Sequence, residues 1–160
     1  TNSDLQMAES EASKSRLKEY AKFFKALTPD IPIVMMSSVR YTKVSQAPAV
    51  FDKNLVDMAH NLDDDIVVLT DDLWGKTLRG WISGSEVPLN DPYPASEFRK
   101  VIKAALDAGN DMFIITYPAK AIDIKKYILE QASGNKKQLA RIEKSIARIL
   151  KMKFRAGLLN

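Results

Sequence analysis

The sequence predicts an α/β fold with about three parallel strands and their helices. Short apolar runs at 33–36, 66–70 and 111–116 are typical of strands buried on both faces. Stretches with apolar residues at helical spacing separate them, and strands that alternate with helices form parallel sheets with right-handed crossovers. Because three parallel strands leave two sheet edges open, we expect the chain to assemble with more strands or to belong to a larger barrel.

In the first half of the chain, the pattern predicts a helix over 9–27, whose apolar residues share one stripe. The sequence Thr-Pro-Asp ends this helix before the strand at 33–36. After a loop, Asp52 is placed to cap a helix over 53–62. The second strand, at 66–70, follows that helix directly.

In the second half, the segment 74–94 contains six Gly and Pro residues and is predicted to be irregular, and such a long loop is usually functional. Ser96 is placed to cap a helix that Gly109 ends, ahead of the third strand. A helix is then predicted over 119–132. A final helix is predicted over 136–155, with its apolar residues on one face.

The length, charge and composition of the chain limit the classes of function that it can have. With 160 residues, of which 46% are hydrophobic, the chain is long enough for one domain with a core. The net charge of +4 is concentrated in 136–155, where basic and apolar residues alternate at helical spacing, so a solvated helix face is expected and no nucleic-acid binding. Without cysteine there are no disulfides or thiolate chemistry, and no apolar run approaches the roughly 20 residues of a membrane span.

The chain begins with Thr-Asn-Ser-Asp rather than with Met or a signal peptide, so we expect it to be cut from something longer. Its localisation stays open between the cytoplasm and a secreted or cell-envelope site.

Two adjacent carboxylates follow the second strand directly. Because burying a charge is costly, Asp71 and Asp72 should lie where the strand leaves the core, at the carboxyl end of the sheet where α/β proteins bind ligands. Asp71 is therefore a catalytic candidate, and the alternative is that one of the two caps the next helix. Since neighbours on a strand point to opposite sides, we expect Asp72 to serve structure by capping or by bonding the following loop.

Four blocks of the sequence resemble, in order, the rear half of the catalytic barrel of glycoside hydrolase family 3. They are 34–44 with 48–51 for the sixth strand and its loop, 67–73 for the seventh strand, 104–115 for the eighth, and 146–159 for the closing helix. The resemblance is closest to the β-N-acetylhexosaminidase branch, in which Asp-Asp-Leu is common. Where many members carry Ala-His after the sixth strand, this chain has Ser37 and Ser38.

The resemblance implies that residues 1–160 form the rear portion of a single (β/α)8 catalytic barrel whose N-terminal half is absent from this chain. It implies retaining hydrolysis of β-linked N-acetylhexosaminides, or β-glucosides, through a covalent glycosyl-enzyme intermediate on Asp71, without a metal or an organic cofactor. The N-terminal half, as a covalent or separate partner, would supply the acid/base. Asp4 is a weaker candidate for that role.

Three more residues are candidates for binding the sugar. Arg40 and Tyr41 lie just past the sixth-strand position, where they line the sugar site or face solvent. Trp74 follows the Asp pair and stacks on a sugar face or packs under the loop after it. The acidic run 63–65 precedes its strand, so a solvated turn is expected there rather than a cation site, and His60 is expected far from the barrel mouth.

Two alternatives to hydrolysis remain open. The first is a catalytically silent half-barrel that acts as a scaffold or interaction module, which the absence of the first half favours and the presence of Asp71 disfavours. The second is a phosphotransfer domain with a magnesium site at Asp71 and Asp72. No phosphate-binding Gly loop accompanies these carboxylates, so it ranks last.

Overall fold

A computed structural model describes residues 6–28, 30–85 and 93–159. Its centre is a parallel sheet with the strand order β2-β4-β5, formed by Ile33–Met36, Val67–Asp72 and Met112–Ile114. The predicted three parallel strands are therefore confirmed. The second strand runs two residues further than predicted, so that both carboxylates belong to it.

A second, two-stranded sheet was not predicted. In it, β1 (Glu9–Ser10) pairs in parallel with β3 (Arg40–Tyr41). The predicted helix over 9–27 is wrong in its first five residues, because α1 spans Lys14–Leu27. The Ser13 hydroxyl accepts a backbone N–H of the first helical turn and thereby fixes the helix start.

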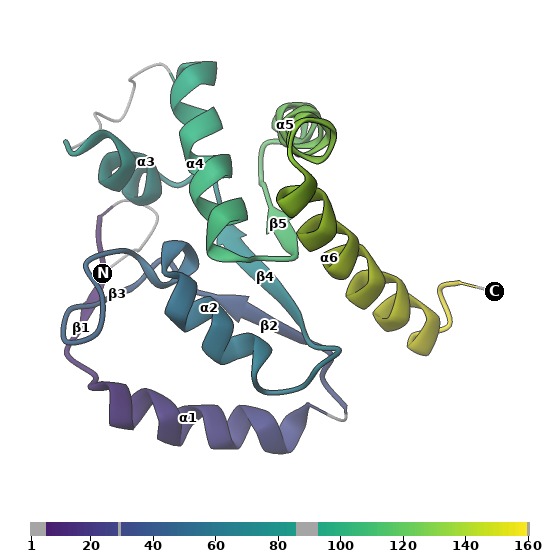
Figure 1. Cartoon of the computed structure of the whole chain (residues 1–160). Helices are drawn as coiled ribbons and strands as arrows, with labels where there is room; N and C mark the ends of the chain where they lie inside the picture. Colours follow the sequence, from purple (N-terminus) through teal and green to yellow (C-terminus); the bar gives the residue numbers. More distant parts are fainter. Residues whose placement is uncertain (1–5, 29, 86–92, 160) are drawn as a thin grey trace.

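Two helices lie side by side against one face of the central sheet (Figure 1). The first, α2, spans Lys53–His60 and is capped by Asp52, as predicted. The second, α4, spans Ala95–Ala108, and the prediction that Ser96 caps it is wrong because Pro94 occupies that position. Pro94 supplies no side-chain cap, and its φ of −60° lies where the proline ring fixes it.

The segment 74–94, predicted to be irregular, contains a helix. This helix, α3, spans Lys76–Ser83, starts after Gly75 without a capping side chain, and ends at Gly84 with φ +72°. Its buried Leu78 packs into the core. The sequence conceals α3 because it has no cap residue and a glycine in its middle, so that burial rather than propensity holds it.

The last third of the chain follows the prediction closely. Gly109 ends α4 with φ +113°, a left-handed conformation that glycine adopts at low cost. After β5, a 3₁₀ turn at Pro118–Lys120 leads into α5 (Ala121–Gly134). The final helix α6 spans Lys136–Arg155 and runs from α5 past the sheet to the C-terminus (Figure 1).

The core lies between the sheet and the helices α2 and α4. Fully buried side chains fill it, among them Val56, Val68, Phe98 and Ile102. The loop after β2 adds a 3₁₀ turn, Ala49–Phe51, whose three residues are all buried. On β2, the side chain of Met35 is 56% exposed.

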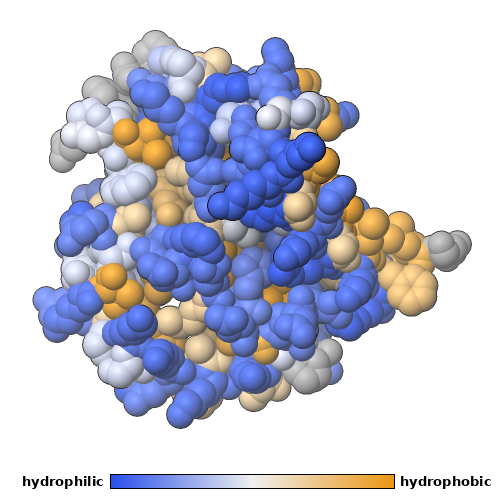
Figure 2. Space-filling model, in the orientation of Figure 1, coloured by the Kyte–Doolittle hydropathy of each residue, from blue (hydrophilic) through white to orange (hydrophobic). Residues whose placement is uncertain are grey.

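The outer helices also expose apolar surface. Large apolar side chains that are at least 39% exposed lie on α1 (Tyr20, Phe23, Phe24, Leu27) and on α6 (Leu139, Ile146, Leu150, Phe154). Figure 2 shows hydrophobic side chains gathered on the surface at the C-terminal end of α6. On α6, Ile142 is buried while Ile146 and Leu150 are exposed, so the apolar side chains of this helix are only partly covered.

Candidate functional site

Asp71 lies at the carboxyl end of β4, the middle strand of the sheet, and is half-buried. Its Oδ2 accepts a hydrogen bond of 3.0 Å from the hydroxyl of Ser38, which follows β2 and is 3% exposed. Its Oδ1 accepts a bond of 2.8 Å from the backbone N–H of Asp72. Each carboxylate oxygen therefore has one neutral donor, and one of these donors comes from the segment that follows the neighbouring strand.

Asp72 binds in a different direction. Its Oδ2 accepts from the Thr116 hydroxyl at 2.7 Å, and its Oδ1 accepts from the backbone N–H groups of Thr116 at 3.0 Å and Trp74 at 3.2 Å. These bonds join the ends of β4 and β5 and fix the start of the following loop. The prediction that Asp72 serves structure by bonding that loop is confirmed.

The indole of Trp74 packs within an aromatic cluster. Its ring lies 5.4 Å from Phe98, edge to face, and 4.5 Å from Tyr93, measured between centroids. Tyr117 stacks on it at 5.3 Å with an interplanar angle of 11°, and Lys120 Nζ lies 5.7 Å from its centroid. The structure thus places Trp74 near the Asp pair with its ring in contact with protein, while contact with a sugar stays a prediction.

Tyr117 is an exposed aromatic residue at this end of the sheet that the sequence reasoning missed. It is 53% exposed and comes directly after Thr116, which is bonded to Asp72. Its position three residues after β5, at the same end of the sheet as Asp71, is the signal that could have singled it out.

Tyr93, whose ring contacts Trp74, also contacts the guanidinium of Arg79. The guanidinium of Arg79 stands 4.6 Å from the ring centroid of Tyr93, and Arg79 Nε donates to Glu97 Oε2 at 2.6 Å. Burial raises the pKa of Tyr93 well above its ordinary value of 10.0. This phenol therefore stays protonated at neutral pH and supplies no negative charge to the site.

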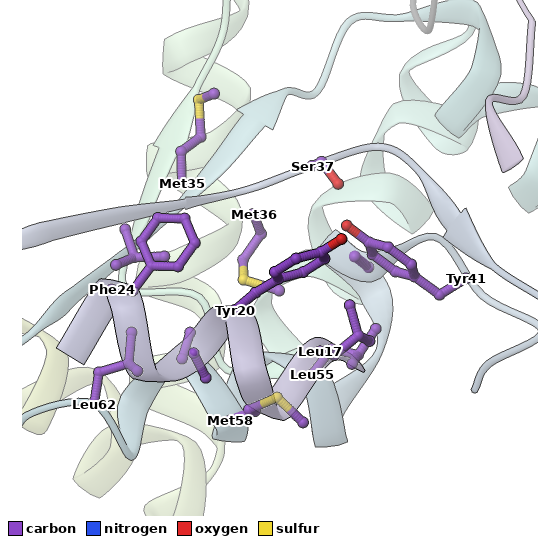
Figure 3. A pocket seen from close by; sticks show the side chains of 14 residues that line it. Leu17, Tyr20, Phe24, Met35, Met36, Ser37, Tyr41, Leu55, Met58 and Leu62 are labelled. Carbon is purple, nitrogen blue, oxygen red and sulfur yellow. The ribbon is translucent and has the colours of Figure 1, made fainter. Parts of the chain in front are cut away.

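The structure places Arg40 and Tyr41 on β3, beyond the end of β2. Arg40 forms an ion pair with Glu9 of β1, and Tyr41 lines a groove of about 220 Å³ between α1 and β2. Figure 3 shows the hydroxyls of Tyr20 and Tyr41 pointing toward the same part of this groove, near Ser37. In the part of the chain that is described, no hydrogen bond joins Arg40 or Tyr41 to Asp71, and their contact with a sugar remains a prediction.

The remaining candidates lie away from Asp71. The acidic run 63–65 precedes β4, and Asp65 there pairs with Lys151 and Arg155 of α6. His60 Nε2 lies 3.0 Å from the carbonyl oxygen of Gly109, before β5 begins. Asp4 lies outside the described residues.

Within residues 6–28, 30–85 and 93–159, no three His, Cys, Asp or Glu side chains are grouped as metal ligands. No helix of the same residues is both long and apolar enough to span a bilayer.

No model of a protein family and no curated protein matches this chain. Several solved structures are similar to this chain. The β-N-acetylhexosaminidase from Beutenbergia cavernae matches with a TM-score of 0.67 and 22% identity over 96% of this chain and 43% of its own. The β-N-acetylglucosaminidase from Thermotoga maritima matches with a TM-score of 0.67 and 18% identity over 91% of this chain and 30% of its own.

Zinc-bound CbsA from Thermotoga neapolitana matches all of this chain, with a TM-score of 0.70, 17% identity and 33% of its own length covered. The chain thus spans less than half the length of each of these proteins. The likeness confirms the predicted fold, an α/β portion of a larger barrel.

Proposed function

We propose that residues 1–160 are the rear portion of a single catalytic barrel of glycoside hydrolase family 3, similar to β-N-acetylhexosaminidases. In this proposal, Asp71 is the nucleophile in retaining hydrolysis of β-linked N-acetylhexosaminides or β-glucosides. The observation that carries it is the Asp71 carboxylate at the carboxyl end of the middle strand, bonded to Ser38, in a fold shared with enzymes named for β-N-acetylhexosaminide hydrolysis.

The reaction needs two groups. A carboxylate oxygen of Asp71 attacks the anomeric carbon as the bond to the leaving oxygen breaks, while an acid/base residue protonates that oxygen. Water, deprotonated by the same acid/base, then displaces Asp71 and restores its carboxylate. Asp72 does not suit the acid/base role, because its two oxygens are held by Thr116 and Trp74. The N-terminal half of the barrel is the proposed source of the acid/base, with Asp4 as the weaker candidate.

The shape of the molecule supports the need for that half. Helix α1 leads into β2, yet among the residues that the structure describes β2 pairs only with β4 in the central sheet. A right-handed crossover through α1 would place a preceding strand beside the free edge of β2. This strand would lie next to the groove between α1 and β2. Apolar groups such as Met35 are exposed at that edge, so a partner that completes the barrel would bury them.

A mechanism-based fluoro-sugar tests the proposal. We expect the chain combined with the N-terminal half to be labelled at Asp71, as located by mass spectrometry of peptides, and the Asp71→Asn variant to stay unlabelled. Asp65→Asn, at the opposite end of β4, is the matched control and should be labelled like the wild type. Labelling at another residue, or none in the assembled protein, contradicts the proposal.

The second candidate is a catalytically silent half-barrel that acts as a scaffold or interaction module. It is favoured by the described residues themselves, where the donors to Asp71 are the Ser38 hydroxyl and the Asp72 backbone N–H and no titratable side chain is hydrogen-bonded to it. The same labelling experiment separates the two functions, because a silent module leaves the fluoro-sugar unreacted even when the partner is bound.

A further inference from the structure

We propose that Ser38 is the positioning residue of Asp71, holding the carboxylate in the single orientation from which it attacks. The inference rests on the proposed function and adds to it a residue from the segment that follows β2. Its basis is the bond of 3.0 Å from the Ser38 hydroxyl to Asp71 Oδ2, which links this segment to the carboxyl end of β4.

The direction of this bond follows from the chemistry of the groups. An ionised carboxylate only accepts hydrogen bonds, so the Ser38 hydroxyl must donate. The backbone N–H of Asp72 donates to the other oxygen at 2.8 Å. One donor on each oxygen, from the segment after β2 and from the backbone of β4 itself, fixes both torsions of the Asp71 side chain.

Ser38 itself is held without help from Asp71. On one side of it, the carbonyl of Ser37 accepts from Val50 N at 3.1 Å, and on the other the carbonyl of Val39 accepts from Ala49 N at 2.9 Å. Both donors belong to the buried 3₁₀ turn at Ala49–Phe51. The hydroxyl is thus presented by a rigid segment, which is the requirement for holding a reacting group in a productive geometry.

The chemistry of serine also makes this donor independent of pH. A serine hydroxyl stays neutral across the working range, whereas an imidazole in its place would gain and lose a proton near pH 6.5, about the ordinary histidine value. A Ser38→His variant should therefore add an ionisation to the pH dependence of labelling that the wild type does not have.

The test compares two neighbouring serines in the assembled protein. Ser38→Ala should lower the maximal rate of fluoro-sugar labelling by about 10- to 100-fold, as for the loss of a hydrogen bond to a charged group, with less than about a twofold change in the inhibitor's binding constant. Ser37→Ala is the matched control, because Ser37 lines the groove beneath α1, and its labelling rate should be unchanged. Ser38→Thr, which keeps the hydroxyl, should recover most of the rate.

A structure of the Ser38→Ala chain provides a readout that needs no activity. We expect the Asp71 carboxylate to leave its position while β2 and β4 stay in place. Equal labelling rates for Ser38→Ala and Ser37→Ala overturn the inference, as does a weaker binding constant with an unchanged maximal rate. If the wild type is not labelled at all, the proposed function fails, and an unmoved carboxylate in the variant structure overturns the positioning role separately.

Discussion

Adjacent residues with identical side chains occupy different environments at the end of β4. Asp71 accepts two hydrogen bonds, from Ser38 and from its own neighbour's backbone, and is left accessible. Asp72 accepts three, all from groups that follow β4 or β5. The alternation of side chains along a strand produces this division, which separates a candidate nucleophile from a structural carboxylate.

The first prediction concerns Asp72. Asp72→Ala should lower the free energy of unfolding by about 1–3 kcal/mol, because the Thr116 and Trp74 groups that it binds lose their acceptor. Urea denaturation measures the loss. Asp71→Asn keeps an oxygen to accept from Ser38 and should cost less than about 0.5 kcal/mol. Equal losses for the two variants would contradict the structural role of Asp72.

At the scale of elements, α6 is attached to the sheet through one buried carboxylate. The Asp111 side chain is fully buried, and its Oδ1 accepts from Ser145 at 2.5 Å and from Arg148 at 3.1 Å. Its Oδ2 accepts from the backbone N–H of Val68 at 3.0 Å. Asp111 thus joins β4, the start of β5 and α6 in one network.

The second prediction tests this attachment. Asp111→Ala should cost about 3–5 kcal/mol, because it leaves Arg148 and Ser145 facing a site without their acceptor. Amide exchange should become faster throughout α6 and near Val68. Asp107→Ala is the control, because Asp107 binds Gln138 of the same helix from an exposed position, and it should cost less than about 1 kcal/mol. Unchanged exchange in α6 after Asp111→Ala would contradict the role of this network.

The third prediction is a pH dependence at the end of α6. A hydrogen bond from Lys151, followed by the charges of Lys151 and Arg155, holds the pKa of Asp65 below its ordinary value of 3.8. A lowered pKa in the folded state stabilises the fold above the ordinary value, and this contribution is lost as the pH falls through the folded value. The protection of backbone amides in the last turns of α6, relative to their intrinsic exchange rates, should therefore fall below about pH 4.

Asp65→Asn supplies the control for this pH dependence. Without the carboxylate, amide protection at the end of α6 should be lower at neutral pH and should not fall further on acidification. Because Lys151 and Arg155 are exposed, molar salt should weaken the effect in the wild type. A transition of equal size in Asp65→Asn would assign the acid sensitivity to another group.

Across the whole molecule, the sequence predicts those features that depend on interactions between residues close together in the chain. The apolar runs identify all three central strands, and capping residues such as Asp52 and Gly109 set helix ends correctly. The two-residue strands β1 and β3 carry no periodicity of their own and form only because distant segments meet. The bond from Ser38 to Asp71 likewise depends on the register between β2 and β4, which no local pattern encodes.

The last prediction concerns the exposed aromatic side chains of α1 and α6. Phe23 on α1 is 72% exposed and Phe154 on α6 is 68% exposed, and these helices flank the β2 and β5 sides of the sheet. Since exposed aromatic rings gain free energy by leaving water, the chain alone should bind a hydrophobic dye and associate as its concentration rises. Addition of the N-terminal half should suppress both effects, as measured by dye fluorescence and sedimentation velocity.

A double variant, Phe23→Lys with Phe154→Lys, distinguishes these surfaces from general instability. Both side chains are solvent-exposed, so the variant should keep the wild-type melting temperature while its self-association weakens. If the barrel is completed across the same helices, the variant should also bind the N-terminal half more weakly. Undiminished self-association would show that these aromatic rings do not form the contact, and tight binding of the half would place the junction elsewhere on the molecule.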